Sequence, residues 1–163
     1  MKTTHFAAEA TLTDDTPETT APRGRDDMDS QEMLVADLMT IDPVTISVDA
    51  PLEEVARLCH VNEVSGLPVI DDGGSLVGVI SQTDLVAIHD SRLSRLIRAE
   101  PSGLRVGEVM SSPAVTVPMT SSLRIAARLM RDDRIHRVVA VDEQGRPIGV
   151  LSASDFVTLF ADG

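Results

Sequence analysis

Gly78-Val79-Ile80-Ser81-Gln82-Thr83-Asp84-Leu85 returns in altered form as Gly149-Val150-Leu151-Ser152-Ala153-Ser154-Asp155-Phe156, and 155 minus 84 gives an offset of 71 residues. Each copy runs from an apolar strand into a helix start of the form Ser-x-Ser/Thr-Asp. A repeat at a fixed offset indicates architecture more strongly than a single motif does. The same offset relates Val35–Thr40 to Val106–Ser111. It also keeps the apolar positions of two helices in register: Leu52, Val55, Ala56 and Cys59 correspond to Leu123, Ala126, Ala127 and Met130.

Length and composition are those of one ordinary soluble domain, built here from two half-domains. The chain has 163 residues, of which 42% are apolar and 25% charged. No apolar run approaches the roughly 20 residues that span a bilayer, and the N-terminus lacks the pattern of a secretory signal, so we expect a cytoplasmic protein. The net charge of −12 argues against binding to nucleic acid or to an anionic membrane.

The first part of the chain divides into a tail and one repeat. Residues 1–30 have few large apolar side chains and form an expected disordered acidic tail. In the first repeat, residues 31–100, we predict a helix at 31–39, a strand at 44–48 and a helix whose N-cap is Asp49. A hairpin of strands 67–70 and 75–80 follows, with Pro68 at a strand start or a sheet edge. A helix from Ser81 to about residue 97 ends the repeat.

The second repeat, residues 101–163, follows the same plan, with helices at 106–110 and 122–132, strands at 115–118, 137–142 and 147–151, and a helix from Ser154. Each unit therefore reads strand, helix, strand, strand, helix. One unit alone leaves an apolar sheet face uncovered, so the two must pack together. The predicted fold class is α+β (mixed α/β): two βαββα repeats whose small three-stranded sheets pack with pseudo-two-fold symmetry. Cys59 is expected to be a buried free thiol.

The order of these motifs resembles the cystathionine-β-synthase (CBS) domain. The segments that carry the resemblance are Met39–Ile46, Gly66–Asp71 and Gly78–Leu85 in the first repeat, and Met110–Pro113, His136–Asp142 and Gly149–Asp155 in the second. The resemblance covers about residues 33–162. It implies a tandem pair, or Bateman module, that binds adenine nucleotides between its repeats, reports to a partner protein and associates as a homodimer.

The Ser-x-x-Asp spacings at Ser81 and Asp84, and at Ser152 and Asp155, have two compatible interpretations. A capping box at a helix start explains them without a ligand. Alternatively, a helix N-terminus suits phosphate, and a carboxylate can accept two hydrogen bonds from a ribose diol. The resemblance assigns Asp84 and Asp155 to ribose hydroxyls, and it places near phosphate or sugar Ser81, Thr83, Ser152 and Ser154.

The basic pair His136 and Arg137 occurs in the second repeat only, since Ser65 and Gly66 stand at the equivalent positions. In nucleotide-binding relatives a basic pair at this position reaches the phosphate, although two polar residues ending a loop would look the same. We therefore expect one better phosphate site, with Asp155, His136 and Arg137, and a weaker or empty cleft near Asp84. With no Trp or Tyr in the chain, adenine must lie between aliphatic groups near Thr40, Thr45, Ser65 and Gly66; Thr116, the counterpart of Thr45, completes the candidate set.

No residue pattern indicates catalysis or a metal site, because the four histidines are scattered and no Gly-rich phosphate loop occurs. The leading hypothesis is a stand-alone regulatory module that needs no cofactor and binds AMP, ADP, ATP or another adenosyl compound to signal to an unknown target protein. The rival is a non-catalytic dimerisation or scaffold protein with inert clefts. Nucleic-acid binding through the arginines between Arg124 and Arg137 is a third possibility, which the acidic total and the lack of stacking aromatics disfavour.

Overall fold

The computed structural model describes residues 33–90 and 103–161. The expected tail at 1–30, and the part of the predicted helix beyond residue 90, lie outside the described residues. The first repeat forms, in order, α1 (Val35–Leu38), β1 (Thr40–Ile41), β2 (Ile46–Ser47), α2 (Glu53–Val61), β3 (Gly66–Ile70), β4 (Leu76–Ser81) and α3 (Gln82–Asp90). The second forms α5 (Val106–Val109), β5 (Thr116–Val117), α6 (Leu123–Asp132), β6 (Arg137–Val141), β7 (Pro147–Ser152) and α7 (Ala153–Ala161).

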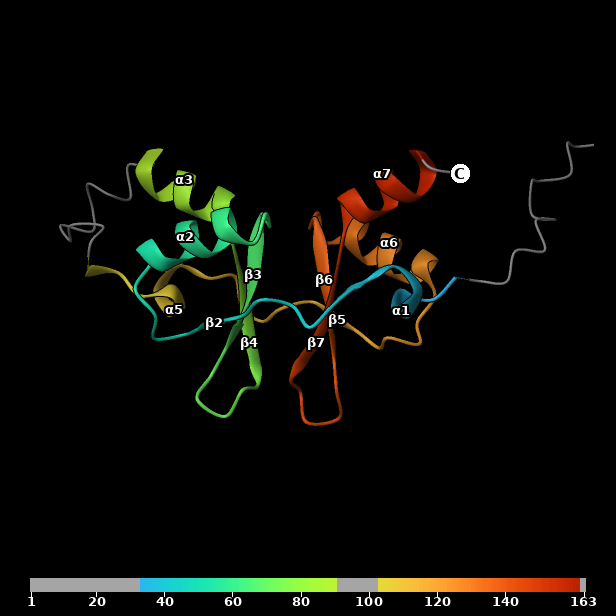
Figure 1. The fold of residues 1–163 in the computed structure, drawn as a ribbon, viewed down its shortest axis with the longest axis horizontal. Coiled ribbons are helices and arrows are strands. Elements are labelled where there is room, and N and C mark those ends of the chain that lie inside the picture. The colour runs from blue at the N-terminus through green and yellow to red at the C-terminus, as the bar shows by residue number, and fades with distance from the viewer. Residues whose placement is uncertain (1–32, 91–102, 162–163) are drawn as a thin grey trace, which may run out of the picture. The chain divides into compact units, whose positions relative to one another are not determined.

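Two small mixed sheets carry the fold, as the repeat predicts. The first has the strand order β2-β3-β4, and the second has the order β1-β7-β6-β5. In the first sheet the central strand β3 pairs with the short parallel strand β2 on one side and with the antiparallel strand β4 on the other. In the second sheet β6 pairs in the same way with β5 and β7. Figure 1 shows β3 and β6 facing each other at the middle, with α2 and α3 outside one sheet and α6 and α7 outside the other. The mixed α/β class of two packed βαββα repeats is confirmed.

The two repeats exchange their first helices. Val35 of α1 is fully buried in the core of the second repeat, and Val106 of α5 is fully buried in the core of the first. Backbone hydrogen bonds hold both crossings: Val35 N–H donates to Ser121 C=O at 2.8 Å, and Val106 N–H donates to Ala50 C=O at 3.0 Å. Each core is therefore closed by a segment that precedes the other repeat.

The fourth strand of the second sheet, β1, was not predicted from the sequence. It pairs antiparallel with β7, with Thr40 opposite Val150 and Ile41 opposite Gly149. The crossing explains the glycine in each copy of the repeated motif. A Cβ on Gly149 would collide with the side chain of Met39, and one on Gly78 would lie 2.7 Å from the sulfur of Met110. Glycine therefore lets the exchanged segment lie directly on the strand.

The prediction that Asp49 caps α2 is wrong. The helix begins at Glu53 with Leu52 as its N-cap, and no side chain caps it. The residues that lead into α5 bind at this end of the helix instead. Leu52 N–H donates to Leu104 C=O at 3.0 Å, and the Asp49 carbonyl accepts from Arg105. In the second repeat Ser122 caps α6 with its side chain.

The expectation that Pro68 lies at a strand start or a sheet edge is also wrong. It is a buried residue in the interior of β3, the central strand of its sheet. Proline is tolerated there because β2 is only two residues long and pairs with Val69 and Ile70, beyond the proline. No ladder partner on that side needs the missing N–H.

Two apolar clusters form the cores, one on each sheet. Leu67 and Ile80 are fully buried in the first, and Leu151 and Val138 are fully buried in the second. Cys59 is 1% exposed in the first core and is a free thiol, as predicted. Within the described ranges, none of the helices has the length and apolar character needed to cross a bilayer.

Candidate functional site

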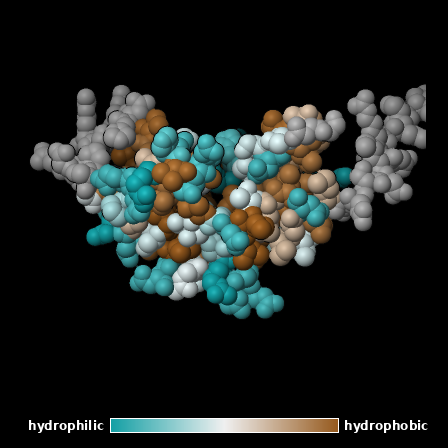
Figure 2. Space-filling model, viewed as in Figure 1, coloured by the Kyte–Doolittle hydropathy of each residue, from teal (hydrophilic) through white to brown (hydrophobic). Residues whose placement is uncertain are grey.

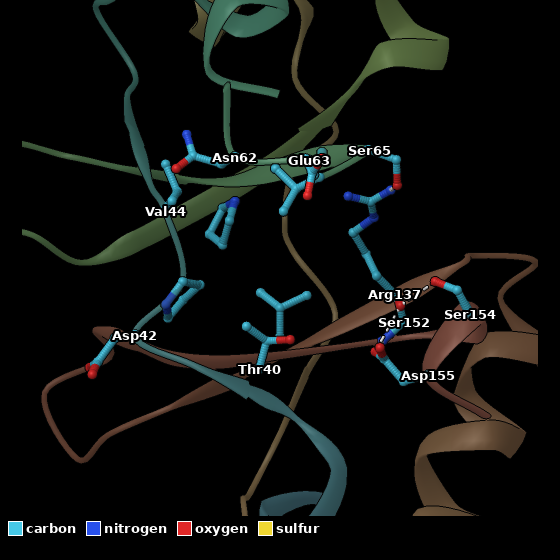
Figure 3. A pocket seen from close by; sticks show the side chains of 15 residues that line it. Thr40, Asp42, Val44, Asn62, Glu63, Ser65, Arg137, Ser152, Ser154 and Asp155 are labelled. Carbon is cyan, nitrogen blue, oxygen red and sulfur yellow. Dashed lines mark hydrogen bonds between the residues drawn. The ribbon is translucent and has the colours of Figure 1, made fainter. Parts of the chain in front are cut away.

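A cavity of about 530 Å³ lies between segments of the two repeats. Figure 3 shows Asn62, Glu63 and Ser65 along one wall and Thr40, Ser152 and Asp155 along the other. The walls come from the loop before β3, from β1 and the loop after it, and from the junction of β7 with α7. The lining residues are Thr40, Asp42, Pro43, Val44, Asn62, Glu63, Val64, Ser65, Gly66, Pro68, Arg137, Val150, Ser152, Ser154 and Asp155.

Asp155 lies in the first turn of α7 and caps it while lining the cavity. Its Oδ2 accepts from Ser152 N–H at 2.6 Å and from Ser152 Oγ at 2.7 Å. The Ser152 and Ser154 hydroxyls are 2.8 Å apart. Both bonds that Asp155 accepts from described residues use Oδ2, so Oδ1 is available to a donor in the cavity. The capping contacts are therefore present, and they are compatible with the ligand interpretation of this residue.

Arg137 reaches across the cavity from the second repeat to the first. Its Nη2 donates to Ser65 Oγ at 2.9 Å (Figure 3). The guanidinium lies over Gly66, where a Cβ would overlap it and would also come within 2.7 Å of the Ile80 carbonyl. Glycine at position 66 is thus required by the Ile80 carbonyl, which cannot move aside, and it also leaves room for the Arg137 guanidinium.

The surroundings of Arg137 are those of an unpaired cation. Burial lowers the pKa of its guanidinium, and the nearby Cys59 and Asp84 partly oppose this. None of the ion pairs within residues 33–90 and 103–161 includes it. A half-buried guanidinium without a carboxylate partner is well suited to an anionic group, to which it can donate paired N–H bonds.

Seven of the predicted site residues line this cavity together: Thr40, Ser65, Gly66, Arg137, Ser152, Ser154 and Asp155. His136 is exposed and does not line it, so the structure does not unite the basic pair around Asp155. Thr45 and Thr116 do not line it either. His136 takes the place of Ser65 in the second repeat: its carbonyl accepts from Ala153 N–H as that of Ser65 accepts from Gln82 N–H.

Asp84 repeats the capping geometry of Asp155 at the start of α3. Its Oδ2 accepts from Ser81 N–H and from Ser81 Oγ, both at 2.7 Å. Like Ser81 and Thr83 it is not among the residues that line the cavity described above, although its charge acts on Arg137. The two aspartates therefore share a local structure and differ in what surrounds them.

Sequence reasoning missed eight lining residues: Asp42, Pro43, Val44, Asn62, Glu63, Val64, Pro68 and Val150. Asp42 and Glu63 have positive φ angles of 49° and 55°, which place their side chains by local turns that no sequence pattern marks. Val150 joins the cavity through its pairing with Thr40, a contact between distant segments. Closeness to a predicted residue was a usable signal for some of them, since Val44 directly precedes Thr45, and Glu63 and Val64 directly precede Ser65.

Metal binding has no support in the described part of the chain. It contains no group of three or more His, Cys, Asp or Glu side chains that could hold an ion. The chemistry of the cavity is instead that of hydroxyl, carboxylate and guanidinium groups among aliphatic side chains, which suits a polar ligand with one flat apolar part.

The CBS-domain model matches residues 35–90 and 106–162, one match for each repeat. The chain belongs to the CBS-domain family. A CBS domain-containing protein of Dictyostelium discoideum is 32% identical over 132 residues, which are 78% of this chain and 91% of that protein. Inosine-5'-monophosphate dehydrogenase of Mycobacterium tuberculosis is 36% identical over 121 residues, but these are only 21% of the dehydrogenase. The CBS pair thus spans about a fifth of the length of that enzyme.

Solved structures show the same architecture. The structure of CBSX2 in complex with AMP has a TM-score of 0.68 and 29% identity, and the match covers 80% of this chain and 97% of that one. A second structure of CBSX2, from Arabidopsis thaliana, has a TM-score of 0.66 and 30% identity over 80% and 95% of the two chains. The agreement extends over nearly the whole of those two chains.

Proposed function

We propose that this CBS pair is a non-catalytic regulatory module that binds an adenosine-containing ligand in the cavity beside Asp155. Occupancy shifts the packing of the two repeats, and a target protein reads the shift. The observation that carries the proposal is the meeting of Asp155 and Arg137 in one cavity between the repeats. The complex of the related CBSX2 with AMP supports the ligand class.

Each part of an adenosine ligand has a fitting partner in the cavity. Asp155 accepts the ribose hydroxyls through Oδ1, and Arg137 donates to a phosphate or another anionic group. The base lies among the aliphatic side chains of Val44, Val64 and Val150, which supply apolar contact without aromatic stacking. The ligand touches both repeats, so its binding energy can favour one arrangement of them over another.

The absence of catalysis is part of the proposal. The cavity joins one half-buried cation to hydroxyls and carboxylates, and its lining includes neither a cysteine nor a histidine. Of its serines, Ser152 and Ser154 lie at the capped start of α7 and Ser65 accepts from Arg137, so their bonds are not those of a nucleophile activated by a base. The dehydrogenase relatives match this chain only over their CBS region, and their activity is not extended to it.

Isothermal titration of ligand-free protein with adenosine, AMP, ADP, ATP and S-adenosylmethionine tests the proposal. CMP is the matched control, because it presents ribose and phosphate with a smaller base. We expect heat and a thermal shift with at least one adenosine compound and weaker binding of CMP. Folded protein that responds to none of the adenosine compounds would reject ligand sensing and leave the scaffold alternative.

Dimerisation is the second candidate function, favoured by exposed apolar side chains on α3 and α7. Val86 is 63% exposed, Val157 68% and Phe160 80%. Figure 1 shows α3 and α7 on the same edge of the two repeats, and Figure 2 shows hydrophobic residues over α7 at the upper right. We propose that a second copy of the chain covers these helices.

Light scattering after size exclusion tests the dimer with a matched pair of variants. Phe160→Glu is expected to give a monomer, whereas Val61→Glu, at a 66% exposed valine on α2, leaves the dimer intact. Retention of AMP binding by the monomer would show that sensing and association are separate properties. A wild-type monomer at high micromolar concentration would reject the dimer proposal.

A further inference from the structure

The charges that line the cavity are mostly negative. Among the described residues that line it, the ionisable ones are the acidic Asp42, Glu63 and Asp155 and the single basic Arg137, and the others are neutral. The sequence placed His136 beside Arg137 in this site and did not indicate Asp42 or Glu63. The structure leaves one cation among three carboxylates.

We propose that this cavity selects adenosyl ligands with at most one phosphate group and rejects the di- and triphosphates. The inference deepens the proposed function and rests on it. Each further phosphate adds at least one negative charge to a lining whose only cation is Arg137. Unlike charges attract and like charges repel most strongly where water is partly excluded, so the sign of the lining decides which ligand is bound.

Arg137 has room for one phosphate. One of its donor nitrogens, Nη2, already binds Ser65 Oγ. The remaining donors can form a paired contact with a single phosphate, which is the geometry that a guanidinium favours. The start of α7 supplies no second anion site, since Asp155 occupies its first turn and accepts from Ser152 N–H.

Glu63 is the residue that a longer phosphate chain would meet. It stands two residues before Ser65, the protein partner of Arg137, and Figure 3 shows it on the wall opposite Asp155 with the Arg137 side chain reaching between them. Its backbone is fixed by a positive φ of 55° and by the bond from the next residue, Val64 N–H, to Cys59 C=O at 3.0 Å. Figure 3 shows Asp42 at the lower left and Arg137 at the right of the cavity.

The second repeat shows that the fold accepts arginine at this turn. Position 134 is the counterpart of position 63 (63 plus 71), and Arg134 has the same φ of 55°. The following residue again donates back into the helix, Ile135 N–H to Met130 C=O at 2.9 Å. Glu63→Arg therefore reverses the charge of this side chain at the cavity. The equivalent turn of the second repeat already holds an arginine, so the backbone can accept the substitution.

The test is titration of the full chain with adenosine, AMP, ADP and ATP in metal-free buffer. For the wild type we expect AMP to bind at least as well as adenosine and ATP to bind about 10-fold or more weakly than AMP. Glu63→Arg should raise the affinity for ATP relative to AMP by about 10-fold, and Glu63→Gln should do so by less. Glu143→Arg makes the same change of net charge at an exposed position outside the cavity and should leave the ratio unchanged.

The outcomes separate the two proposals. ATP binding as tightly as AMP, or an equal rise in ATP affinity with Glu143→Arg, would overturn the selectivity while leaving adenosine binding in place. Binding of none of the four compounds would overturn the proposed function itself. Melting curves confirm that each variant is folded, and Glu63→Gln, which keeps the size of the side chain, carries the test if Glu63→Arg does not fold.

Discussion

Asp155 and Asp84 are equivalent residues of the two repeats with the same local structure and different surroundings. Each caps a helix by accepting from the serine three residues before it, Ser81 or Ser152, at nearly the same distances. Only Asp155 lines the cavity that Arg137 enters. The capping role is therefore common to both residues, and the proposed binding role belongs to Asp155 alone, because packing between the repeats places only this one at the cavity.

Replacing each aspartate by alanine separates the two roles. Both variants should lose about 1 kcal/mol of stability, because each loses a helix cap. Asp155→Ala should in addition weaken AMP binding by about 10-fold or more, since the ribose loses its acceptor. Asp84→Ala serves as the control for loss of the cap. Equal losses of affinity in the two variants, measured by titration calorimetry, would contradict this assignment.

At the scale of elements, one carboxylate accepts the hydrogen bonds that stabilise the turn between β6 and β7. Asp142 Oδ1 accepts from the backbone N–H groups of Gln144 and Arg146 at 2.9 and 2.8 Å, and its Oδ2 accepts from Arg146 Nε at 2.9 Å. The Arg146 backbone bond is the main cause that lowers the pKa of Asp142, and the Arg146 side chain and the Gln144 N–H act in the same direction. The turn is therefore stabilised by an ionised carboxylate.

This gives the hairpin a defined dependence on pH. Because the folded state lowers the pKa, the contribution of Asp142 is complete above its ordinary value near 3.8 and is lost as pH falls through the lower folded value. Asp142→Ala should reduce the free energy of unfolding at pH 7 and change it little at a pH below the folded value. Urea denaturation across this range measures the effect, and Glu143→Ala, its exposed neighbour in the turn, is the control. A constant difference at all pH values would contradict the role of the charge.

The contact of β7 with Met39 and with β1 depends on the absence of a side chain at position 149. Gly149→Ala places a methyl group into Met39, so we expect a loss of roughly 1–3 kcal/mol from overpacking. Gly103→Ala is the matched control, because none of the described residues lies within 4 Å of a Cβ built there. Chemical denaturation compares the two variants. An unchanged stability for Gly149→Ala would mean that Met39 can move aside without cost.

For the molecule as a whole, the exchange of α1 and α5 makes the two repeats one folding unit. Val35→Ala and Val106→Ala each leave a gap in the core of the other repeat, which should cost roughly 2–3 kcal/mol. Both variants should still unfold in a single transition, because neither core is complete without the exchanged helix. Calorimetry checks this. Two separate transitions, with only one displaced in each variant, would contradict the coupling.

The sequence predicts the elements of this molecule better than their partners. The offset of 71 residues and the hydrophobic periods gave the central hairpins and most helices, because these depend on local patterns. The strand β1 and the burial of Val35 depend on contacts with the distant repeat, and no local pattern reports them. The failed Asp49 cap has the same origin, since Leu104 of the exchanged segment binds at that helix end.

The residues of the candidate site likewise divide into those that a local sequence pattern marks and those that depend on distant contacts. Asp155, Ser152 and Arg137 were found because motif and resemblance mark them. Glu63 was missed although it lies two residues before Ser65, because a charged residue after a helix usually points to solvent. Its place at the cavity follows from a backbone turn with positive φ and from the approach of the other repeat. These are the features on which the selectivity for phosphate number depends.

The exchange of α1 and α5 also bears on what a break in the chain would do. A protease that cuts between residues 90 and 103 would produce two fragments, each holding the helix that completes the other's core. The fragments would remain bound to each other after the cut, and fragments made separately would fold only on mixing. The protein is thus suited to fragment complementation, in which recovery of adenosine binding would report that the halves have met.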